Sequence, residues 1–391
     1  MNVQRFRNDT PGTQNVIHFN NAGASLMPQV VSKSIMTYLH EESSYGGYET
    51  AHRNRESIQQ TYTVIAEFIN AHPDELALLE NATSAWNMAF FSIDFSNGDR
   101  ILTSKAEYAS NYLSYLRLKK QVDIAIEVIP NDDHGQTSVS ALEKMMDSNV
   151  KLISITHIPT NSGLVNPVEE IGNIAKKSDC YYLVDACQSV GQYPVDVDKI
   201  GCDMLSTTGR KYLRGPRGTG FLYVKRDKIK RLLPPFIDLH AAEWTSEDKY
   251  EVRDDARRFE NWEMNYAGIM GLKKAVEYAN DIGIQRIWKY ITKLAEKLRW
   301  EMAKLPGITI HDIGQIKGGI VTFTVDSVPA KEVKVYLSKK GINVSTSSRS
   351  STLLDMKQRD LPTLVRASLH YYNTEAEIHQ FIDALKGILN K

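Results

Sequence analysis

The chain has 391 residues, and its 47 basic and 47 acidic side chains cancel. This balance excludes the basic field that attracts nucleic acid and the polybasic patch that binds anionic lipid, so we expect neither a nucleic-acid nor a membrane partner. We also expect a cytoplasmic protein without a metal site, because the first residues lack an apolar signal segment, no apolar run approaches membrane-spanning length, and the three cysteines show no metal-ligand spacing.

Short apolar runs alternate with amphipathic stretches in the first part of the chain. The predicted strands cover residues 75–79, 100–103, 125–129, 151–155, 181–184, 203–206 and 220–224. The predicted helices cover residues 29–42, 54–70, 84–91, 109–120, 138–146 and 168–177. Strands that alternate with crossover helices predict an α/β fold with a mostly parallel, doubly wound sheet.

The pattern changes near Phe259, where two long helical stretches follow each other at residues 267–281 and 284–304. Shorter strands are then predicted at 308–310, 319–325, 342–344 and 364–369, with helices at 330–339 and 374–389. Thr374 and Glu377 have the spacing of a capping box at the start of the last helix. We therefore expect a large domain over residues 1–260 and a smaller α+β domain over residues 261–391.

One lysine, Lys211, stands between a predicted strand and a turn rich in glycine and proline. Upstream, another predicted strand runs into Asp185, and Gln188 follows one helical turn later. A lysine that forms an imine and a carboxylate that pairs with a pyridine nitrogen are the groups that hold pyridoxal phosphate (PLP). On its own, Lys211 would be interpreted as a solvated side chain, and Asp185 as a helix cap. Together with Gln188, which would contact the phenolic oxygen of the cofactor, they favour PLP.

A phosphate group needs backbone N–H groups and hydroxyls at the start of a helix. Thr83 and Ser84 supply both directly after the first predicted strand, and Thr208 and Arg210 lie next to Lys211. A simple helix cap is the alternative for Thr83 and Ser84. In the cofactor reading, these four residues bind the phosphate.

Three further residues follow predicted strands or lie in one. Tyr108 would stack on the cofactor ring, with a core tyrosine as the alternative, and Asn161 or its neighbour Thr160 would meet the substrate or the phenolic oxygen. Arg366 lies inside an apolar strand, where a charge is costly without a partner. A substrate carboxylate held by Arg366 is the preferred reading, and a buried salt bridge is the alternative.

In their order along the chain, these motifs resemble class V of the fold-type I PLP enzymes, a superfamily with cysteine desulfurases, selenocysteine lyases, isopenicillin N epimerase and C–S lyases. The resemblance runs from Ile17 to the last helix, and its anchors are 184–188, 209–211, 215–220 and 366–374. It implies the fold-type I fold, PLP on Lys211, and a homodimer that acts on an amino-acid substrate.

The chain departs from the desulfurases of this family in one loop and at two further positions. Those enzymes carry a mobile loop with a nucleophilic cysteine, and the matching stretch 344–352 contains no cysteine. They also have histidines where this chain has Tyr108 and Arg210. The resemblance therefore favours a C–S lyase without a persulfide relay, in which Lys211 removes the α-proton and Arg366 holds the carboxylate. A class V aminotransferase or an amino-acid epimerase stays an open alternative, and a non-catalytic binding module is a further one.

Overall fold

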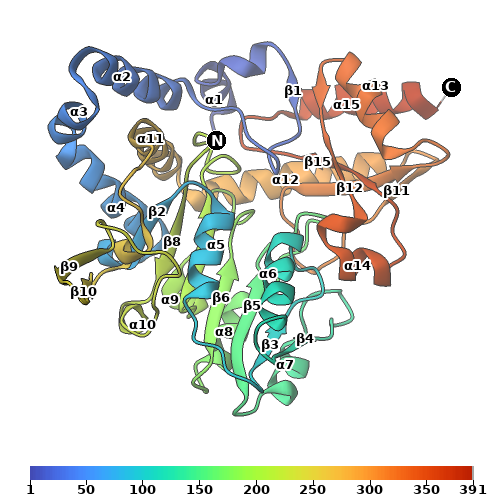
Figure 1. Ribbon diagram of the computed structural model, residues 1–391. Helices are drawn as coiled ribbons and strands as arrows, with labels where there is room; N and C mark the ends of the chain where they lie inside the picture. The colour runs from blue at the N-terminus through green and yellow to red at the C-terminus, as the bar shows by residue number, and fades with distance from the viewer. Residues whose placement is uncertain (390–391) are drawn as a thin grey trace.

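The computed structural model describes residues 1–389 and contains a large main sheet with a smaller sheet beside it (Figure 1). The main-sheet strands are β2 (Leu76–Leu79), β3 (Arg100–Thr103), β4 (Ala125–Val128), β5 (Val150–Thr156), β6 (Tyr181–Asp185), β7 (Met204–Thr208) and β8 (Gly220–Val224). Their order is β2-β8-β7-β6-β5-β3-β4, and β8 is antiparallel to both of its neighbours while the other pairs are parallel. The predicted α/β class with a mostly parallel sheet is confirmed.

Apolar residues on successive positions of the central strands explain why helices cover both faces of this sheet. Leu152 and Leu183 belong to one apolar cluster, whereas the next residues, Ile153 and Val184, belong to another. Because successive side chains of a strand point to opposite faces, such continuous apolar runs bury both. The connecting helices are α4 (Arg55–Ile69), α5 (Ala82–Phe91), α6 (Ala109–Lys119), α7 (Val139–Met145), α8 (Val168–Ala175), α9 (Val197–Ile200) and α10 (Arg226–Ile229).

The C-terminal part contains the smaller sheet and its own apolar cluster. Helices α11 (Tyr266–Ile282) and α12 (Ile284–Met302) lead to strands β11 (Ile308–Ile310), β12 (Ile320–Val325), β14 (Ser345–Ser347) and β15 (Leu364–Ser368) and to helices α13 (Ala330–Lys339), α14 (Leu353–Gln358) and α15 (Glu375–Leu389). The strands form an antiparallel sheet in the order β11-β12-β15-β14. The domain boundary at residue 260 stays a prediction.

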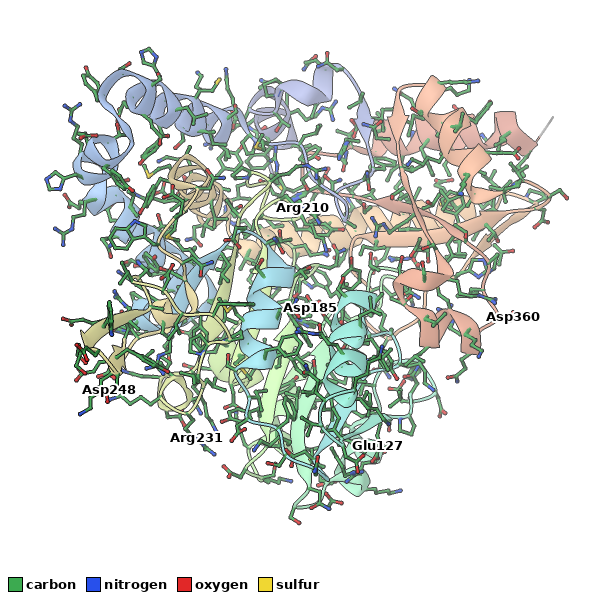
Figure 2. All side chains as sticks on the ribbon, in the orientation of Figure 1. Glu127, Asp185, Arg210, Arg231, Asp248 and Asp360 are labelled. Carbon is green, nitrogen blue, oxygen red and sulfur yellow. The ribbon has the colours of Figure 1, made fainter. Side chains whose placement is uncertain are left out.

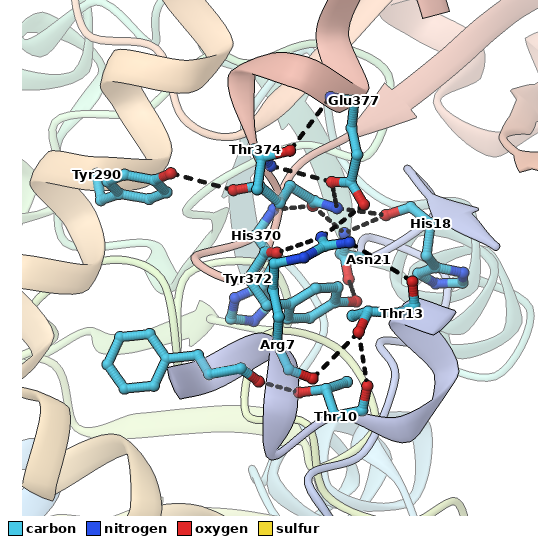
Figure 3. A network of polar contacts seen from close by, with 12 residues as sticks. Arg7, Thr10, Thr13, His18, Asn21, Tyr290, His370, Tyr372, Thr374 and Glu377 are labelled. Atoms are coloured by element: carbon cyan, nitrogen blue, oxygen red, sulfur yellow. Dashed lines mark hydrogen bonds and ion pairs between the residues drawn. The ribbon is translucent and has the colours of Figure 1, made fainter. Parts of the chain in front are cut away.

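The N-terminal segment is fastened to the C-terminal part. Strand β1 (Ile17–His18), which follows helix α1 (Val3–Asn8), pairs with β13 (Ile342–Asn343). Arg7 forms an ion pair of 2.6 Å with Glu377 and donates a hydrogen bond to the carbonyl of Tyr372 (Figure 3). Thr374 and Glu377 exchange the two hydrogen bonds of the predicted capping box. The N-terminal segment thus meets the start of α15, and the loop after β1 reaches the main sheet, where Gln188 and Arg210 donate hydrogen bonds to its carbonyls.

Several elements have no apolar pattern in the sequence and were not predicted. The hairpin of β9 (Ala242–Ser246) and β10 (Lys249–Val252) lies at the edge of the molecule, with most of its side chains exposed (Figure 1). Strand β14 contains no apolar residue and is held by pairing with β15.

Helix α2 (Gln29–Tyr45) is three residues longer than the predicted helix 29–42, and the short helix α3 (Gly47–Arg53) follows it. None of the helices within residues 1–389 is long and apolar enough to cross a membrane.

Candidate active site

A cavity of about 220 Å³ lies at the carboxyl ends of the main-sheet strands. Residues that end or follow β2, β3, β5, β6 and β7 line it, which is where ligands bind in open α/β sheets. The predicted residues that line this cavity are Thr83, Tyr108, Asp185, Gln188, Thr208, Arg210 and Lys211. Asp185 and Arg210 lie close to α5 in the middle of the molecule (Figure 2). The fold thus brings together residues that lie far apart in the sequence, from Thr83 to Lys211.

Lys211 follows β7 in a turn that backbone hydrogen bonds hold in place. The N–H of Gly209 donates to Thr219, and the N–H of Gly215 donates to the carbonyl of Gly209. Burial lowers the pKa of Lys211, and the positive charges of Arg210 and Arg366 lower it further, whereas Cys187 and Asp185 act in the opposite direction. A lowered pKa increases the share of the neutral amine, and the neutral amine is the form that attacks an aldehyde.

Asp185 is the last residue of β6 and is buried at the cavity wall. Its Oδ1 accepts a hydrogen bond of 3.0 Å from the N–H of Cys187, and its Oδ2 accepts one of 3.0 Å from Nδ2 of Asn111. Gln188, also buried, donates from Nε2 to the carbonyl of Ala22, and its Oε1 has no hydrogen-bond partner among the described residues. The wall therefore offers a fixed carboxylate and a buried amide with free hydrogen-bonding capacity.

The other end of the cavity contains the N-terminus of α5. Asn81 caps this helix by accepting a hydrogen bond of 3.0 Å from the N–H of Ser84, so the N–H groups of Ala82 and Thr83 precede the first helical bonds. Asn81, Ala82 and Thr83 line the cavity together with Thr208 and Arg210. This end has the backbone donors, hydroxyls and positive charge that an anion requires.

Ser84 does not line this cavity. Its N–H is taken by Asn81, and its side chain lines a different cavity with Phe91 and Arg117. The reason is that α5 begins at Ala82, two residues before the predicted start, so Ser84 is the third residue of the helix and not its first. Of the two hydroxyl residues predicted there, the structure places only Thr83 at the cavity, among residues 1–389.

Gly220 lets β8 approach the start of α5. A Cβ atom on this glycine would lie 2.5 Å from the carbonyl oxygen of Thr207 and 3.2 Å from Cα of Asn81. Both contacts are with backbone, which cannot move aside as a flexible side chain does. The close approach of β7, β8 and α5 thus depends on a residue without a side chain.

Arg366 lies on β15, is 7% exposed and is not among the residues of 1–389 that line the cavity. Its Nη1 donates to the carbonyl of Thr160 at 3.3 Å and to the Thr160 hydroxyl, and Thr160 lines the cavity. Nε of Arg366 is buried without a partner in the described part of the chain, and burial lowers the pKa of its guanidinium. No carboxylate in residues 1–389 forms an ion pair with Arg366, as a buried salt bridge would require.

The side chain of Asn161 is turned away from the cavity residues. Its Nδ2 donates a hydrogen bond of 2.6 Å to Oδ2 of Asp355, on α14. Asn161 was predicted to bind both cofactor and substrate, but of these two neighbours the structure places Thr160 at the cavity. They lie in a loop after β5, where strand periodicity does not tell which side chain points inward.

The structure also adds lining residues that the sequence interpretation did not include: Asn81, Asn111 and Thr156. Asn111 lies three residues after Tyr108 at the start of α6, so helical spacing was the available signal for it. Tyr108 itself is 39% exposed at the cavity. Within residues 1–389, no group of three or more histidine, cysteine or acidic side chains could hold a metal ion.

These observations fit PLP. The helix N-terminus with Thr83, Thr208 and Arg210 matches a phosphate, Asp185 matches a protonated ring nitrogen, and Lys211, whose pKa is lowered, matches an aldehyde. Gln188 adds a buried amide whose Oε1 lacks a partner among residues 1–389.

Comparisons with known proteins agree with this fit. The aminotransferase class-V family model matches residues 17–381. The chain is 32% identical to a probable cysteine desulfurase of Methanothermobacter thermautotrophicus over 99% of this chain and 98% of the relative, and 30% identical to one of Pyrococcus abyssi over 98% and 96%. The apo structure of a cysteine desulfurase from Thermococcus onnurineus NA1 superimposes with a TM-score of 0.93 at 28% identity, over 99% of this chain and 98% of that one. The chain therefore belongs to the aminotransferase class-V family, and it is a PLP-dependent, cysteine desulfurase-like enzyme of that family.

Proposed function

We propose that this enzyme is a lyase that cleaves the Cβ–S bond of a cysteine-type amino acid and releases the sulfur without a protein-bound persulfide. The observation that carries the proposal is the cavity lined by Lys211 and Asp185, with Arg366 bonded to its lining residue Thr160. The stretch 344–352, which pairs through β14 with the strand of Arg366, contains no cysteine. Relatives named cysteine desulfurases support the cysteine-type substrate. We also expect a homodimer.

Bound PLP supplies an aldehyde that captures an amine and a ring that withdraws electrons from the adjacent carbon. The residues that would hold it are Thr83, Thr208 and Arg210 at the phosphate, Asp185 at the ring nitrogen, Gln188 at the phenolic oxygen, Tyr108 at the ring face and Lys211 at the aldehyde.

Arg366 would bind the substrate carboxylate. Its Nε has no partner among residues 1–389, and Thr160 fixes its Nη1, so the guanidinium keeps unused donors in a set orientation. A carboxylate held there would orient the Cα–H bond of the substrate. When its amine is free, Lys211 accepts the α-proton at Nζ, as its lowered pKa favours.

The raised pKa values of the three cysteine thiols support the proposal that sulfur leaves as a small molecule. Cys180 and Cys202 are buried in the sheet region, and burial raises the pKa of both thiols. Cys187 lines the cavity, but burial and the negative charge of Asp185 raise the pKa of its thiol as well. A thiol is a poor nucleophile while it stays protonated, so Cys187 is badly suited to accept sulfur.

Product analysis tests the proposal. The PLP-loaded enzyme is incubated with L-cysteine, L-cystine and S-alkyl cysteines, and we expect one pyruvate and one ammonium, with one water consumed, for each sulfide, cysteine persulfide or thiol released, respectively. Alanine in place of pyruvate would instead indicate desulfuration, and an amino-acid product that requires an added keto acid would indicate transamination. Inversion at Cα without any release of sulfur would indicate an epimerase. Any of these three results would overturn the proposal that the enzyme is a lyase.

A further inference from the structure

Glu107 is a buried carboxyl group that the proposed mechanism does not use. It follows β3 and is 3% exposed. Its oxygens accept hydrogen bonds from the Thr103 hydroxyl (2.9 Å), the Tyr108 N–H (2.8 Å), Nδ2 of Asn111 (2.9 Å), the Thr156 hydroxyl (2.5 Å) and the Tyr115 hydroxyl (3.4 Å). A carboxylate that accepts so many hydrogen bonds has a well-defined position. The groups that donate them come from β3, β5, α6 and the residue before α6.

Asn111 connects Glu107 to the active-site carboxylate. Its single Nδ2 group donates to Oε1 of Glu107 at 2.9 Å and to Oδ2 of Asp185 at 3.0 Å. An amide nitrogen has two hydrogens, so each carboxylate receives one. Asn111 and Asp185 line the cavity, whereas Glu107 lies behind them. The position of Oδ2 of Asp185 therefore depends on Glu107 through one shared amide.

Glu107 is surrounded by neutral hydrogen-bond donors. Around Glu107, Thr103, Thr156, Asn111 and Tyr108 contribute neutral donors, and the titratable groups are Asp185 and Tyr115. Burial raises the pKa of Tyr115 well above its usual value, so the phenol is neutral. Burial also raises the pKa of Glu107 to about 7; the negative charge of Asp185 adds to this effect, while hydrogen bonds oppose it. The charge of Asp185 acts on Lys211, but neither carboxyl group forms an ion pair with a cationic side chain of residues 1–389. Two neighbouring buried carboxylates without an ion pair favour a positively charged ligand group at Asp185.

We propose that Glu107 is a positioning residue for the cofactor: it holds Oδ2 of Asp185 through Asn111, and its negative charge strengthens the attraction of this end of the cavity for a protonated ring nitrogen. The inference rests on the proposed placement of the ring nitrogen at Asp185. It adds a charge that acts from behind the cavity wall and touches neither cofactor nor substrate.

Glu107→Gln separates charge from shape. The glutamine oxygen can keep the donors Tyr108, Asn111 and Thr156, and its amide can face the hydroxyls of Thr103 and Tyr115, which are able to accept. Glu169→Gln on α8, an exposed position, is the matched control. The dissociation constant of PLP is measured by titration of each apoenzyme at pH 6 and pH 8.5. A second titration uses a deaza analogue of PLP, in which C–H replaces the ring nitrogen.

At pH 8.5 we expect Glu107→Gln to bind PLP about tenfold more weakly than the parent, the equivalent of one pKa unit. At pH 6 the difference should shrink to within about twofold, because Glu107 is then mostly protonated in the parent as well. With the deaza analogue the two proteins should bind alike at both pH values. Equal PLP binding at pH 8.5, or a loss that is the same at both pH values and with the analogue, would overturn the proposal.

Asn111→Ala provides a second route if Glu107→Gln fails to fold. It removes the shared amide and leaves Glu107 in place. We expect weaker PLP binding and a shifted absorption maximum of the bound cofactor, and an unchanged affinity and spectrum would contradict the proposal. Failure of the proposed function would look different, since the parent protein would then bind PLP with these pH-dependent properties and still release no pyruvate.

Discussion

Asp185 and Lys211 come from the ends of the neighbouring strands β6 and β7, and the negative charge of Asp185 raises the pKa of the lysine while burial lowers it more strongly. The two residues therefore share one cavity without forming an ion pair that would hold the lysine fully protonated. This balance leaves the amine able to bond to an aldehyde, and it leaves the carboxylate available for a ring nitrogen.

Replacing Lys211 by alanine should abolish the covalent attachment of PLP. We expect loss of the visible absorption of the attached cofactor and a fall in turnover of roughly 10³-fold, because the covalent anchor and the proton acceptor disappear together. Borohydride reduction followed by peptide mass analysis checks this, with the exposed Lys177→Ala as the control. A chromophore that still reduces onto the alanine variant would remove the basis of the mechanism.

Arg366→Lys keeps the positive charge, but we expect it to weaken substrate binding. Lysine lacks the planar donor pair that holds a carboxylate, and it cannot reproduce the hydrogen bonds to Thr160. We expect KM to rise about 10- to 100-fold, in line with the loss of about 1.5–3 kcal/mol for a hydrogen bond to a charged group. Steady-state kinetics measure the effect, and Arg349→Lys, partly exposed and paired with Asp360, serves as the control. An unchanged KM would show that the carboxylate binds elsewhere.

Cys187→Ala should retain activity. The raised pKa of this thiol keeps it protonated at neutral pH, so it does not act as a nucleophile in the proposed reaction. We expect turnover within about threefold of the parent, an effect of packing alone. If the variant loses sulfur release while it still binds PLP, and mass spectrometry detects a persulfide on Cys187 of the parent, then sulfur is relayed through the cavity.

Gly220→Ala should damage the phosphate end of the cavity. The added methyl group would meet the backbone of Thr207 and Asn81, and relief of this contact must displace β8 or the start of α5. We expect a loss of about 1–3 kcal/mol in the free energy of unfolding, as for other overpacked sites, and weaker PLP binding. Urea denaturation and cofactor titration measure both, with Gly47→Ala, an exposed position at the start of α3, as the control. Equal effects of the two substitutions would contradict the argument from close approach.

His157 should make stability depend on pH in the acid range. Burial lowers the pKa of its imidazole from the usual 6.5 to about 3. Between these two pH values the imidazole is protonated in the unfolded chain but not in the folded one. The free energy of unfolding should therefore fall as the pH drops from about 6.5 toward 3, by roughly 1 kcal/mol per pH unit. Urea midpoints at pH 7.5 and 5.5 are compared for the parent, His157→Gln and the exposed His40→Gln. The pH difference should shrink in His157→Gln and persist in His40→Gln, and the same slope in all three would refute the assignment.

The apolar runs of the central strands and the residues that end them were enough to predict the α/β class and most of the cavity. Strand periodicity is local, and the carboxyl ends of parallel strands meet at one edge, so Asp185 and Lys211 could be placed together from the sequence. Elements without an apolar face escaped prediction. The β9–β10 hairpin and β14 have few or no buried apolar side chains, and backbone pairing holds them in place.

The sequence by itself determined which chemistry the chain carries: an amine, a carboxylate and a helix start, each after a strand. Only the tertiary structure decided that Thr160 rather than Asn161 faces the cavity, that Ser84 turns to another cavity, and that Glu107 supports Asp185 through Asn111. The physical reason is that side-chain directions in loops and at helix starts follow from contacts with distant segments, such as Asp355 for Asn161, and not from a repeating local geometry.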